Sequence, residues 1–365
     1  MITRLKVKRH AFETAEIATA PLPELAEGQV LARVERFALT ANNITYAATG
    51  DKIGYWQFFP EDHAEWGMVP VWGFAVVESS CHPDVPVGTR VYGYLPMASH
   101  VVMAPTRVSS RGFTDGAPHR AALPAVYNFY QRTNDDSAEW AAAADWRCLL
   151  IPLMITGYVI GDYVNDNGGF GATQMVIGSA SSKTGIATAH HVKSLAESPV
   201  ALIGLTSPGN IAFCEGLGVY DRVVAYADVE TLDAAVPMLF IDMAGDGGLT
   251  TRLHHHFGAN MKASIGVGLT HWQSRVGQAG RPPRDLPGAK PIFFFAPAQI
   301  AKRRAEWGPG VLDQRMLEAN LAFLPVMAQH LKIERGEGAE AVAAAYAEMV
   351  AGRTAADVGV MLSFG

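Results

Sequence analysis

Hydrophobic and polar positions follow two different rhythms along this chain. Up to about residue 110, short apolar runs at 30–34, 71–77 and 90–94 are separated by Gly and Pro, as expected for strands joined by tight turns. Beyond residue 150, short apolar segments alternate with spacers of helix length. These segments are 175–177, 200–205, 222–225, 238–243, 263–267 and 292–295. The predicted fold class is therefore α/β, with a β-rich first domain and a doubly wound parallel sheet in the second.

Helical patterns complete the predicted architecture. The run AAAADWRCLLIPLMITGYVIGDYV should be helical on both sides of a start or kink at Pro152, and a domain boundary is expected near residue 150. Further patterns predict helices at 299–307, 312–331 and 339–350. The last apolar run, VGVMLSF, is strand-like and is expected to return to the sheet of the first domain.

Composition excludes several classes of protein. The chain has 365 residues, 49% of them hydrophobic and 18% charged, which is enough apolar sequence for two globular cores. A net charge of −6 without a Lys/Arg block argues against a nucleic-acid partner. The three cysteines are far apart and form no C-x-x-C pair, so a reducing compartment is expected. There is no signal-peptide pattern and no run of eighteen apolar residues, so we expect a cytoplasmic protein that does not enter a membrane.

The segment QMVIGSASSKTGIATA carries the most specific chemical signal. An apolar strand breaks into a turn of small residues and then into an Ala-rich helix, which is how a strand delivers a dinucleotide phosphate to a helix N-terminus. The spacing departs from G-x-G-x-x-G, because Ala180 stands where the second Gly is expected. An ordinary turn that binds nothing is the alternative. The candidate cofactor-binding residues of this turn are Ser179, Ala180, Ser181, Ser182, Lys183 and Thr184.

The end of the second predicted strand, ALIGLTSPGN, indicates which nucleotide is bound. An NAD site places an Asp or Glu here to bind the adenosine ribose, whereas this chain offers the neutral Thr206, Ser207 and Asn210. Nothing therefore repels a 2′-phosphate, and Lys183 can supply a countercharge. This pattern favours NADP(H) over NAD. The alternatives are that Lys183 is merely solvated and that Thr206 and Ser207 cap the next helix.

Four segments stand in this order along the chain: EGQVLARVERFALTANNITYAATGD, VPVGTRVYGYLP, the strand-turn-helix above and LGVYDRVVAY. Taken together, they resemble the medium-chain dehydrogenase/reductase superfamily, and within it the zinc-independent members similar to quinone oxidoreductases. NNITY, VPVWGF, SASSKT and FFFAP are similar to a little-characterised branch, the DUF2855 domain of unknown function. The resemblance implies a GroES-like β-barrel catalytic domain from 1–150 and 296–365, and a Rossmann dinucleotide-binding domain at 151–295. It places the active site in the cleft between these domains, and it leaves a homodimer open, because members commonly pair through an edge strand of the nucleotide domain.

The zinc ligands of the metal-dependent relatives have no counterpart here. Ala38, Leu39 and Thr40 fill the region of the first ligand, and Trp72, Gly73 and Phe74 replace the His-Glu segment. Metal-assisted alcohol oxidation therefore loses its Lewis acid. The run 254–256 consists of three histidines, but consecutive helical residues point about 100° apart and do not converge on one ion.

The resemblance also implies candidate catalytic residues. Tyr46 is expected to donate a hydrogen bond or a proton to the enolate formed by hydride transfer, with Asn43 assisting in orientation. Thr156 resembles a Thr that approaches the nicotinamide or the substrate. The alternatives are structural: a turn-capping Asn, a packed Tyr, and a Thr bonded to its own helix. Gly245 and Gly266, together with Gly268, follow the fourth and fifth strands, where such sheets bind ligands.

These observations together predict an NADP(H)-dependent, zinc-free oxidoreductase that reduces an activated C=C bond or a quinone. The substrate is expected to be a small apolar or aromatic molecule, because five large aromatic residues crowd one stretch, although core packing explains them equally well. They are Trp56, Phe58, Phe59, Trp66 and Trp72. A carbonyl reductase of the same fold and an NADP-binding sensor without turnover are the alternatives.

Overall fold

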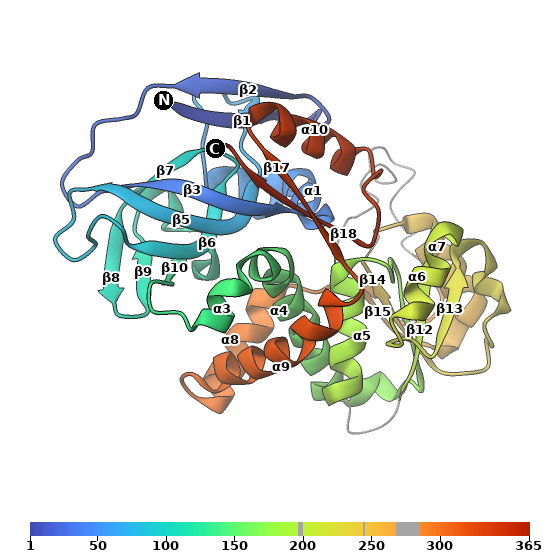
Figure 1. The fold of residues 1–365 in the computed structure, drawn as a ribbon. Helices are drawn as coiled ribbons and strands as arrows, with labels where there is room; N and C mark the ends of the chain where they lie inside the picture. The colour runs from blue at the N-terminus through green and yellow to red at the C-terminus, as the bar shows by residue number, and fades with distance from the viewer. Residues whose placement is uncertain (196–199, 244, 268–284) are drawn as a thin grey trace. The chain divides into compact units, whose positions relative to one another are not determined.

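The computed structural model describes residues 1–195, 200–243, 245–267 and 285–365 (Figure 1). The chain divides into two compact units. The first contains Met1–Leu149 and Leu331–Gly365, and the second contains Leu150–His330. This division differs from the expected one at residues 296–330, which group with the second unit.

The first unit is built on two sheets, whose strand pairs are antiparallel except for the parallel pair β17 and β18. A three-stranded sheet has the order β2-β1-β4, and a nine-stranded sheet has the order β17-β18-β3-β5-β6-β10-β9-β8, with β7 paired to β3. The strands are β1 Ile2–Lys8, β2 Ala15–Ala20, β3 Val30–Leu39, β4 Trp66–Gly67, β5 Pro70–Ser80, β6 Arg90–Pro96, β7 His100–Met103, β8 Pro105–Ser109, β9 Gly112–Asp115, β10 Phe129–Arg132, β17 Lys332–Glu337 and β18 Val358–Ser363. The helices are α1 Ala41–Ala48, α2 Gly50–Ile53, α3 Ala138–Ala142 and α10 Ala339–Val350, with short 3₁₀ turns η1 Tyr55–Gln57, η2 Pro118–Arg120 and η3 Ala125–Tyr127.

Strand β3 is the centre of the larger sheet. Most of its side chains are buried, and it pairs with β5 on one side and with the carboxyl-terminal β18 on the other. The prediction that the tail returns to this sheet is confirmed. Gly73 lets β5 come close to β3, because a Cβ there would lie 2.3 Å from the carbonyl oxygen of Arg36.

The second unit is built on a six-stranded parallel sheet of order β13-β12-β11-β14-β15-β16. All its pairings are parallel, and the order is that of a doubly wound dinucleotide-binding sheet, as predicted. The strands are β11 Gln174–Ile177, β12 Ala201–Thr206, β13 Arg222–Ala225, β14 Met238–Asp242, β15 Met261–Gly266 and β16 Pro291–Phe293. The helices are α4 Ala144–Asp166, which begins in the first unit, α5 Lys183–Leu195, α6 Ile211–Gly216, α7 Gly247–Phe257, α8 Ala296–Trp307 and α9 Val311–Ala328, and the 3₁₀ turns are η4 Gly168–Gly171, η5 Pro208–Asn210, η6 Tyr226–Thr231 and η7 Gly258–Asn260.

Helices α4 and α5 pack closely beside one another, as Figure 1 shows. A Cβ on Gly157 would lie 2.7 Å from the backbone and Cβ of Ala187, so only glycine permits this approach. Helix α4 runs through Pro152 without ending there. It is long and apolar enough to cross a bilayer, but 67% of its most apolar window is buried inside the protein. That burial is typical of a core helix.

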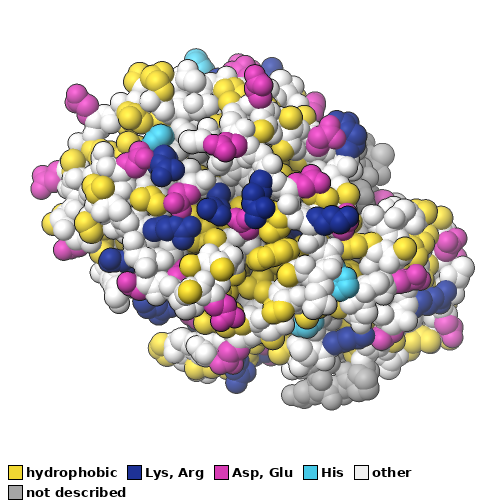
Figure 2. Space-filling model, viewed as in Figure 1, with side chains coloured by type: hydrophobic (Ala, Val, Ile, Leu, Met, Phe, Trp, Pro, Cys, Tyr) yellow, Lys and Arg dark blue, Asp and Glu magenta, His cyan; other side chains and the backbone are white. Residues whose placement is uncertain are grey.

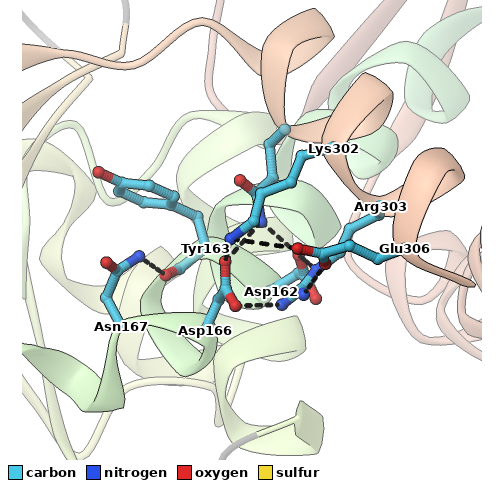
Figure 3. A network of polar contacts seen from close by, with 8 residues as sticks. Asp162, Tyr163, Asp166, Asn167, Lys302, Arg303 and Glu306 are labelled. Atoms are coloured by element: carbon cyan, nitrogen blue, oxygen red, sulfur yellow. Dashed lines mark hydrogen bonds and ion pairs between the residues drawn. The ribbon is translucent and has the colours of Figure 1, made fainter.

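A charged network fastens α8 to α4 and explains why residues 296–330 group with the second unit (Figure 3). The guanidinium of Arg303 lies 2.7 Å from Asp162 and 2.9 Å from Asp166. Lys302 also pairs with Asp166, and Gln299 donates to Asp162 at 2.8 Å. The Arg303 and Asp162 side chains are only 11% and 9% exposed, so solvent screens their attraction poorly.

Candidate functional site

The turn after β11 makes hydrogen bonds to Leu205 in the neighbouring strand β12 and to Tyr226, which follows β13. Ser179 adopts a left-handed conformation with a φ of 52°, which is strained for a residue with a side chain. Tyr226 stabilises it, because its hydroxyl accepts a hydrogen bond from the Ser179 N–H at 2.9 Å and donates one to Ser179 Oγ at 3.3 Å. The Ala180 N–H donates to the carbonyl of Leu205 at 2.9 Å. These hydrogen bonds fix the backbone of Ser179 and Ala180, so the small residues of the turn lie directly before the N-terminus of α5.

The turn then enters α5 at Lys183. Ser182 closes the first turn of the helix, because its Oγ accepts from the Gly185 N–H at 3.1 Å. A Cβ on Gly185 would lie 2.7 Å from the Ser179 carbonyl oxygen, so glycine is needed there. Within the part of the chain that the structure describes, the N–H groups of Ser181 and Thr184 donate to no protein acceptor. Two backbone donors therefore remain available to an anion at the positive end of α5.

The predicted ribose-reading residues lie beside this turn. Ser181 Oγ is 3.2 Å from both Thr206 Oγ1 and Asn210 Nδ2, and Asn210 also donates to Ser207 Oγ at 3.1 Å. The Ser207 side chain makes no capping hydrogen bond to the following 3₁₀ turn. The structure thus joins four predicted residues, from the turn and from the end of β12, into one neutral polar cluster.

The predicted glycines follow strands at the same edge of the parallel sheet. Gly245 has a φ of 72°, and its N–H donates to Asp242 Oδ1 at 2.7 Å, at the end of β14. Gly266 ends β15, and a Cβ there would lie no closer than 3.6 Å to the nearest atom, the Ile292 carbonyl oxygen. Gly268 lies outside the described residues. The carboxyl ends of β11, β12, β14 and β15 therefore all carry predicted cofactor residues.

In the first unit, Tyr46 lies on α1 and is 5% exposed. Its hydroxyl oxygen accepts a hydrogen bond from the Trp72 indole N–H at 3.3 Å. Burial, with the neighbouring Tyr55, raises the pKa of Tyr46 well above its usual value, while hydrogen bonds from Trp72 and Asn42 offset part of that rise. Tyr46 is therefore a neutral hydrogen-bond donor at physiological pH.

Asn43 and Thr156 both make structural hydrogen bonds. Asn43 Oδ1 accepts from the Thr40 N–H at 2.7 Å and from Thr40 Oγ1 at 3.1 Å, which caps α1, and its Nδ2 donates to the Pro70 carbonyl at 2.8 Å. Thr156 Oγ1 donates to the Pro152 carbonyl at 2.9 Å, one turn earlier in α4. These are the structural alternatives raised by the sequence, and both side chains fix the helices that carry them.

The aromatic residues near 56–72 divide into two groups. Trp56, Phe58 and Phe59 are at most 5% exposed and belong to the core, whereas Trp66 and Trp72 are half-buried. Trp72 stands directly opposite Ala38 across β3 and β5, so the two segments compared above with zinc-ligand positions lie side by side. Among the described residues, no group of three His, Cys, Asp or Glu side chains is placed to hold a metal ion.

The histidines at 254–256 point in different directions, as predicted. His254 Nδ1 bonds the Pro287 carbonyl at 2.8 Å, and His256 Nε2 bonds the Leu232 carbonyl at 2.7 Å. His255 is exposed. Each ring therefore has its own surroundings, and the three do not form one site.

Sequence reasoning missed two sets of residues. Tyr226 follows β13 within the segment LGVYDRVVAY, but nothing local shows that its hydroxyl reaches Ser179, 47 residues away. Tyr55, Tyr94 and Tyr127 gather around Tyr46, with ring centroids 4.5 Å from Tyr46 to Tyr55 and 4.7 Å from Tyr94 to Tyr127. They come from η1, β6 and η3, so only tertiary packing brings them together.

Charges of both signs are mixed on the surface that Figure 2 shows. On this face, Lys and Arg side chains lie among Asp and Glu side chains. Exposed charges of the protein also form ion pairs, such as Arg33 with Glu78 at 2.7 Å. No broad basic area is visible on this face, in keeping with the net charge of −6. This distribution suits a small-molecule site better than a polyanion surface.

Comparison with known proteins places these features in a family. The sequence profile of "Protein of unknown function (DUF2855)" matches residues 37–355. Among curated protein sequences, none matches this chain.

Solved structures with the same fold cover the whole chain at low sequence identity. CurA from Vibrio vulnificus is 11% identical with a TM-score of 0.59, over 100% of this chain and 99% of its own. Mycobacterial Rv1454c, which was crystallised with NADPH, is 12% identical with a TM-score of 0.58, over 100% of both chains. The quinone oxidoreductase from Coxiella burnetii is 12% identical with a TM-score of 0.53, over 99% of both chains. The predicted fold class, a GroES-like β domain with a Rossmann domain, is confirmed.

Proposed function

Because the chain belongs to the DUF2855 family and has the medium-chain reductase fold, we propose that it is an NADP(H)-dependent, zinc-free oxidoreductase. Its reaction would reduce an activated C=C bond or a quinone. Similar proteins support this proposal: mycobacterial Rv1454c binds NADPH in its crystal structure, and a Coxiella burnetii relative is named a quinone oxidoreductase. In this proposal, the second unit binds the cofactor and the first unit supplies polar side chains to the substrate.

The observation that carries the proposal is the turn between β11 and α5. The unengaged N–H groups of Ser181 and Thr184 suit a diphosphate at the positive end of α5. The neutral cluster of Ser181, Thr206, Ser207 and Asn210 can donate hydrogen bonds to a ribose 2′-phosphate without repelling it. Lys183, half-buried at the first position of α5, would add a positive charge there.

The remaining groups suit hydride transfer to a conjugated acceptor. When bound, NADPH supplies the hydride, and the acceptor oxygen gains negative charge. Tyr46 would donate a hydrogen bond to that oxygen, because Trp72 already donates to the Tyr46 oxygen and burial keeps the phenol protonated. Asn43 acts as a positioning residue, since it holds α1 against β5. The Thr156 hydroxyl donates its proton to the Pro152 carbonyl. Its oxygen would therefore accept a hydrogen bond, for example from a nicotinamide carboxamide.

The test begins with the purified protein titrated with NADPH and with NADH, followed by NADPH oxidation across a panel of enones, quinones and ketones. We expect tighter binding of NADPH and turnover of enones or quinones. Turnover of ketones alone would identify a carbonyl reductase. NADPH binding without any turnover would identify a sensor, and tighter binding of NADH would contradict the proposed cofactor.

Replacing Tyr46 with Phe should lower kcat roughly 100-fold, which is the usual cost of losing one donor to a developing oxyanion. The wild-type pH profile gives an independent check. Because burial raises the pKa of Tyr46, the phenol stays protonated through pH 10, and kcat/KM should show no loss from its ionisation between pH 7 and 10. A fall in this range that disappears in the Tyr46→Phe variant would contradict the assignment.

We also propose that the protein forms a homodimer through the edge strand β16. This strand pairs only with β15 among the described strands, and its Ile292 and Phe293 side chains are 44% and 61% exposed. Exposed apolar residues on an unpaired edge favour association with a second copy. Phe293→Asp should convert a dimer into a monomer in light scattering after size exclusion. A wild-type protein that is monomeric at micromolar concentration would refute this.

The cytoplasm remains the proposed location. Cys81 is exposed, and Cys148 and Cys214 are buried; all three are free thiols. Burial raises the pKa of Cys214 to about 11, so this thiol is protonated and unreactive at neutral pH. A reducing compartment suits such a set of cysteines.

A further inference from the structure

Four tyrosine hydroxyls and one indole N–H meet inside the first unit. Tyr46, Tyr55, Tyr94 and Tyr127 pack together against Trp72, with ring centroids 5.5 Å from Tyr46 to Tyr94 and 5.2 Å from Trp72 to Tyr94. The hydroxyls of Tyr46, Tyr127 and Tyr55 all interact electrostatically with that of Tyr94. We call these five residues the phenol cluster. Its members come from α1, β5, η1, β6 and η3, so the fold assembles it from distant segments.

The phenol cluster has an excess of hydrogen-bond donors. The Trp72 N–H donates to Tyr46, and the Tyr55 and Tyr127 hydroxyls lie 3.2 Å apart, so one of them donates to the other. Within the described chain, no carboxylate or backbone carbonyl accepts a hydrogen bond from these four hydroxyls. Burial raises the pKa of each phenol, so all four remain donors at neutral pH.

Tyr94 is the member of the phenol cluster whose hydroxyl lacks a hydrogen-bond partner altogether among the described residues. Its side chain is 0% exposed. A buried hydroxyl without a partner lowers stability by roughly 1–3 kcal/mol, and a ligand that accepts its hydrogen bond is one arrangement that offsets this cost. Tyr92, two residues earlier on β6, shows the ordinary arrangement, because its hydroxyl donates to the Arg147 carbonyl at 3.2 Å.

We infer that Tyr94 is a specificity-determining residue that donates a hydrogen bond to a carbonyl oxygen of a planar, conjugated substrate such as a quinone. A flat ring with oxygen acceptors matches both features of the phenol cluster, its aromatic faces and its surplus donors. The inference rests on the proposed function in one respect, that a reducible carbonyl compound is the substrate. It goes further by naming the residue that selects acceptor oxygens and the class of substrate it selects.

The test compares two ligands of the same shape in the presence of saturating NADP⁺, which prevents turnover. These are 2,3-dimethyl-1,4-naphthoquinone, whose blocked positions do not arylate Cys81, and 2,3-dimethylnaphthalene, which lacks the oxygens. Binding is followed by quenching of tryptophan fluorescence. We expect the wild-type protein to bind the quinone more tightly than the hydrocarbon, and Tyr94→Phe to weaken quinone binding roughly tenfold while hydrocarbon binding is unchanged.

Two controls separate ligand binding from packing. Tyr92→Phe removes a hydroxyl from the same strand and should leave quinone affinity unchanged. Tyr94→Phe should unfold at the wild-type denaturant concentration or above it, because the lost hydroxyl had no partner. Equal quinone affinity of Tyr94→Phe and wild type, or no preference of the wild type for the quinone, would overturn the inference. A third outcome separates the two proposals. If the wild type prefers the quinone through Tyr94 but turns over no acceptor, the role of Tyr94 is supported and the proposed reaction is refuted.

Discussion

Ser181→Asp is expected to weaken NADPH binding more than 100-fold, the largest functional effect we predict. Ser181 contributes an unengaged N–H to the turn, and its Oγ joins Thr206 and Asn210. A carboxylate there would face the phosphates of the dinucleotide, and juxtaposed like charges cost several kcal/mol in a binding interface. Fluorescence titration with NADPH measures the loss directly, and kcat/KM for NADPH should fall with it.

Two further variants test whether the loss of NADPH binding in Ser181→Asp arises at the phosphate turn. Ser110→Asp adds the same charge at an exposed turn of the first unit and should bind NADPH like the wild type. Lys183→Ala should weaken NADPH roughly tenfold more than NADH if the ammonium contacts the 2′-phosphate. Equal losses for both nucleotides would place Lys183 at the diphosphate instead. Wild-type affinity in Ser181→Asp would show that the turn does not bind the cofactor.

Asp162→Ala is expected to lower the free energy of unfolding by about 3 kcal/mol, the largest structural effect we predict. Asp162 Oδ2 accepts from Arg303 Nε at 2.7 Å and from Gln299 Nε2 at 2.8 Å (Figure 3). Removing the carboxylate leaves a nearly buried guanidinium with Asp166 and Glu306 as its remaining acidic partners. Denaturant unfolding measures the change.

The matched control is Asp313→Ala, which breaks an exposed pair with Arg304 at 2.7 Å and should cost less than about 1 kcal/mol. A double variant, Asp162→Leu with Arg303→Met, should recover much of the lost stability, because it removes both charges together. If Asp162→Ala is no more costly than Asp313→Ala, the network does not hold α8 on α4.

The sequence by itself determined the second unit with good accuracy. The apolar segments of all six predicted strands overlap β11 to β16, and the expected parallel, doubly wound order is the one observed. A buried parallel strand is a short continuous apolar run, so local pattern defines it. In the structure, Ser181, Thr206 and Asn210 lie near one another, because the carboxyl ends of neighbouring parallel strands lie at one edge of the sheet.

Only the tertiary structure decided what each polar side chain contacts. The Asn43 amide donates to the Pro70 carbonyl, 27 residues away, and the Tyr226 hydroxyl contacts Ser179, 47 residues away, although neither contact leaves a local pattern. Likewise, 296–330 join the second unit through Asp162 and Arg303, which are 141 residues apart. Periodicity reports which face of an element is buried, whereas hydrogen bonds between distant segments depend on how those faces pack. For the same reason, only the folded structure shows that the Tyr94 hydroxyl has no hydrogen-bond partner among the described residues.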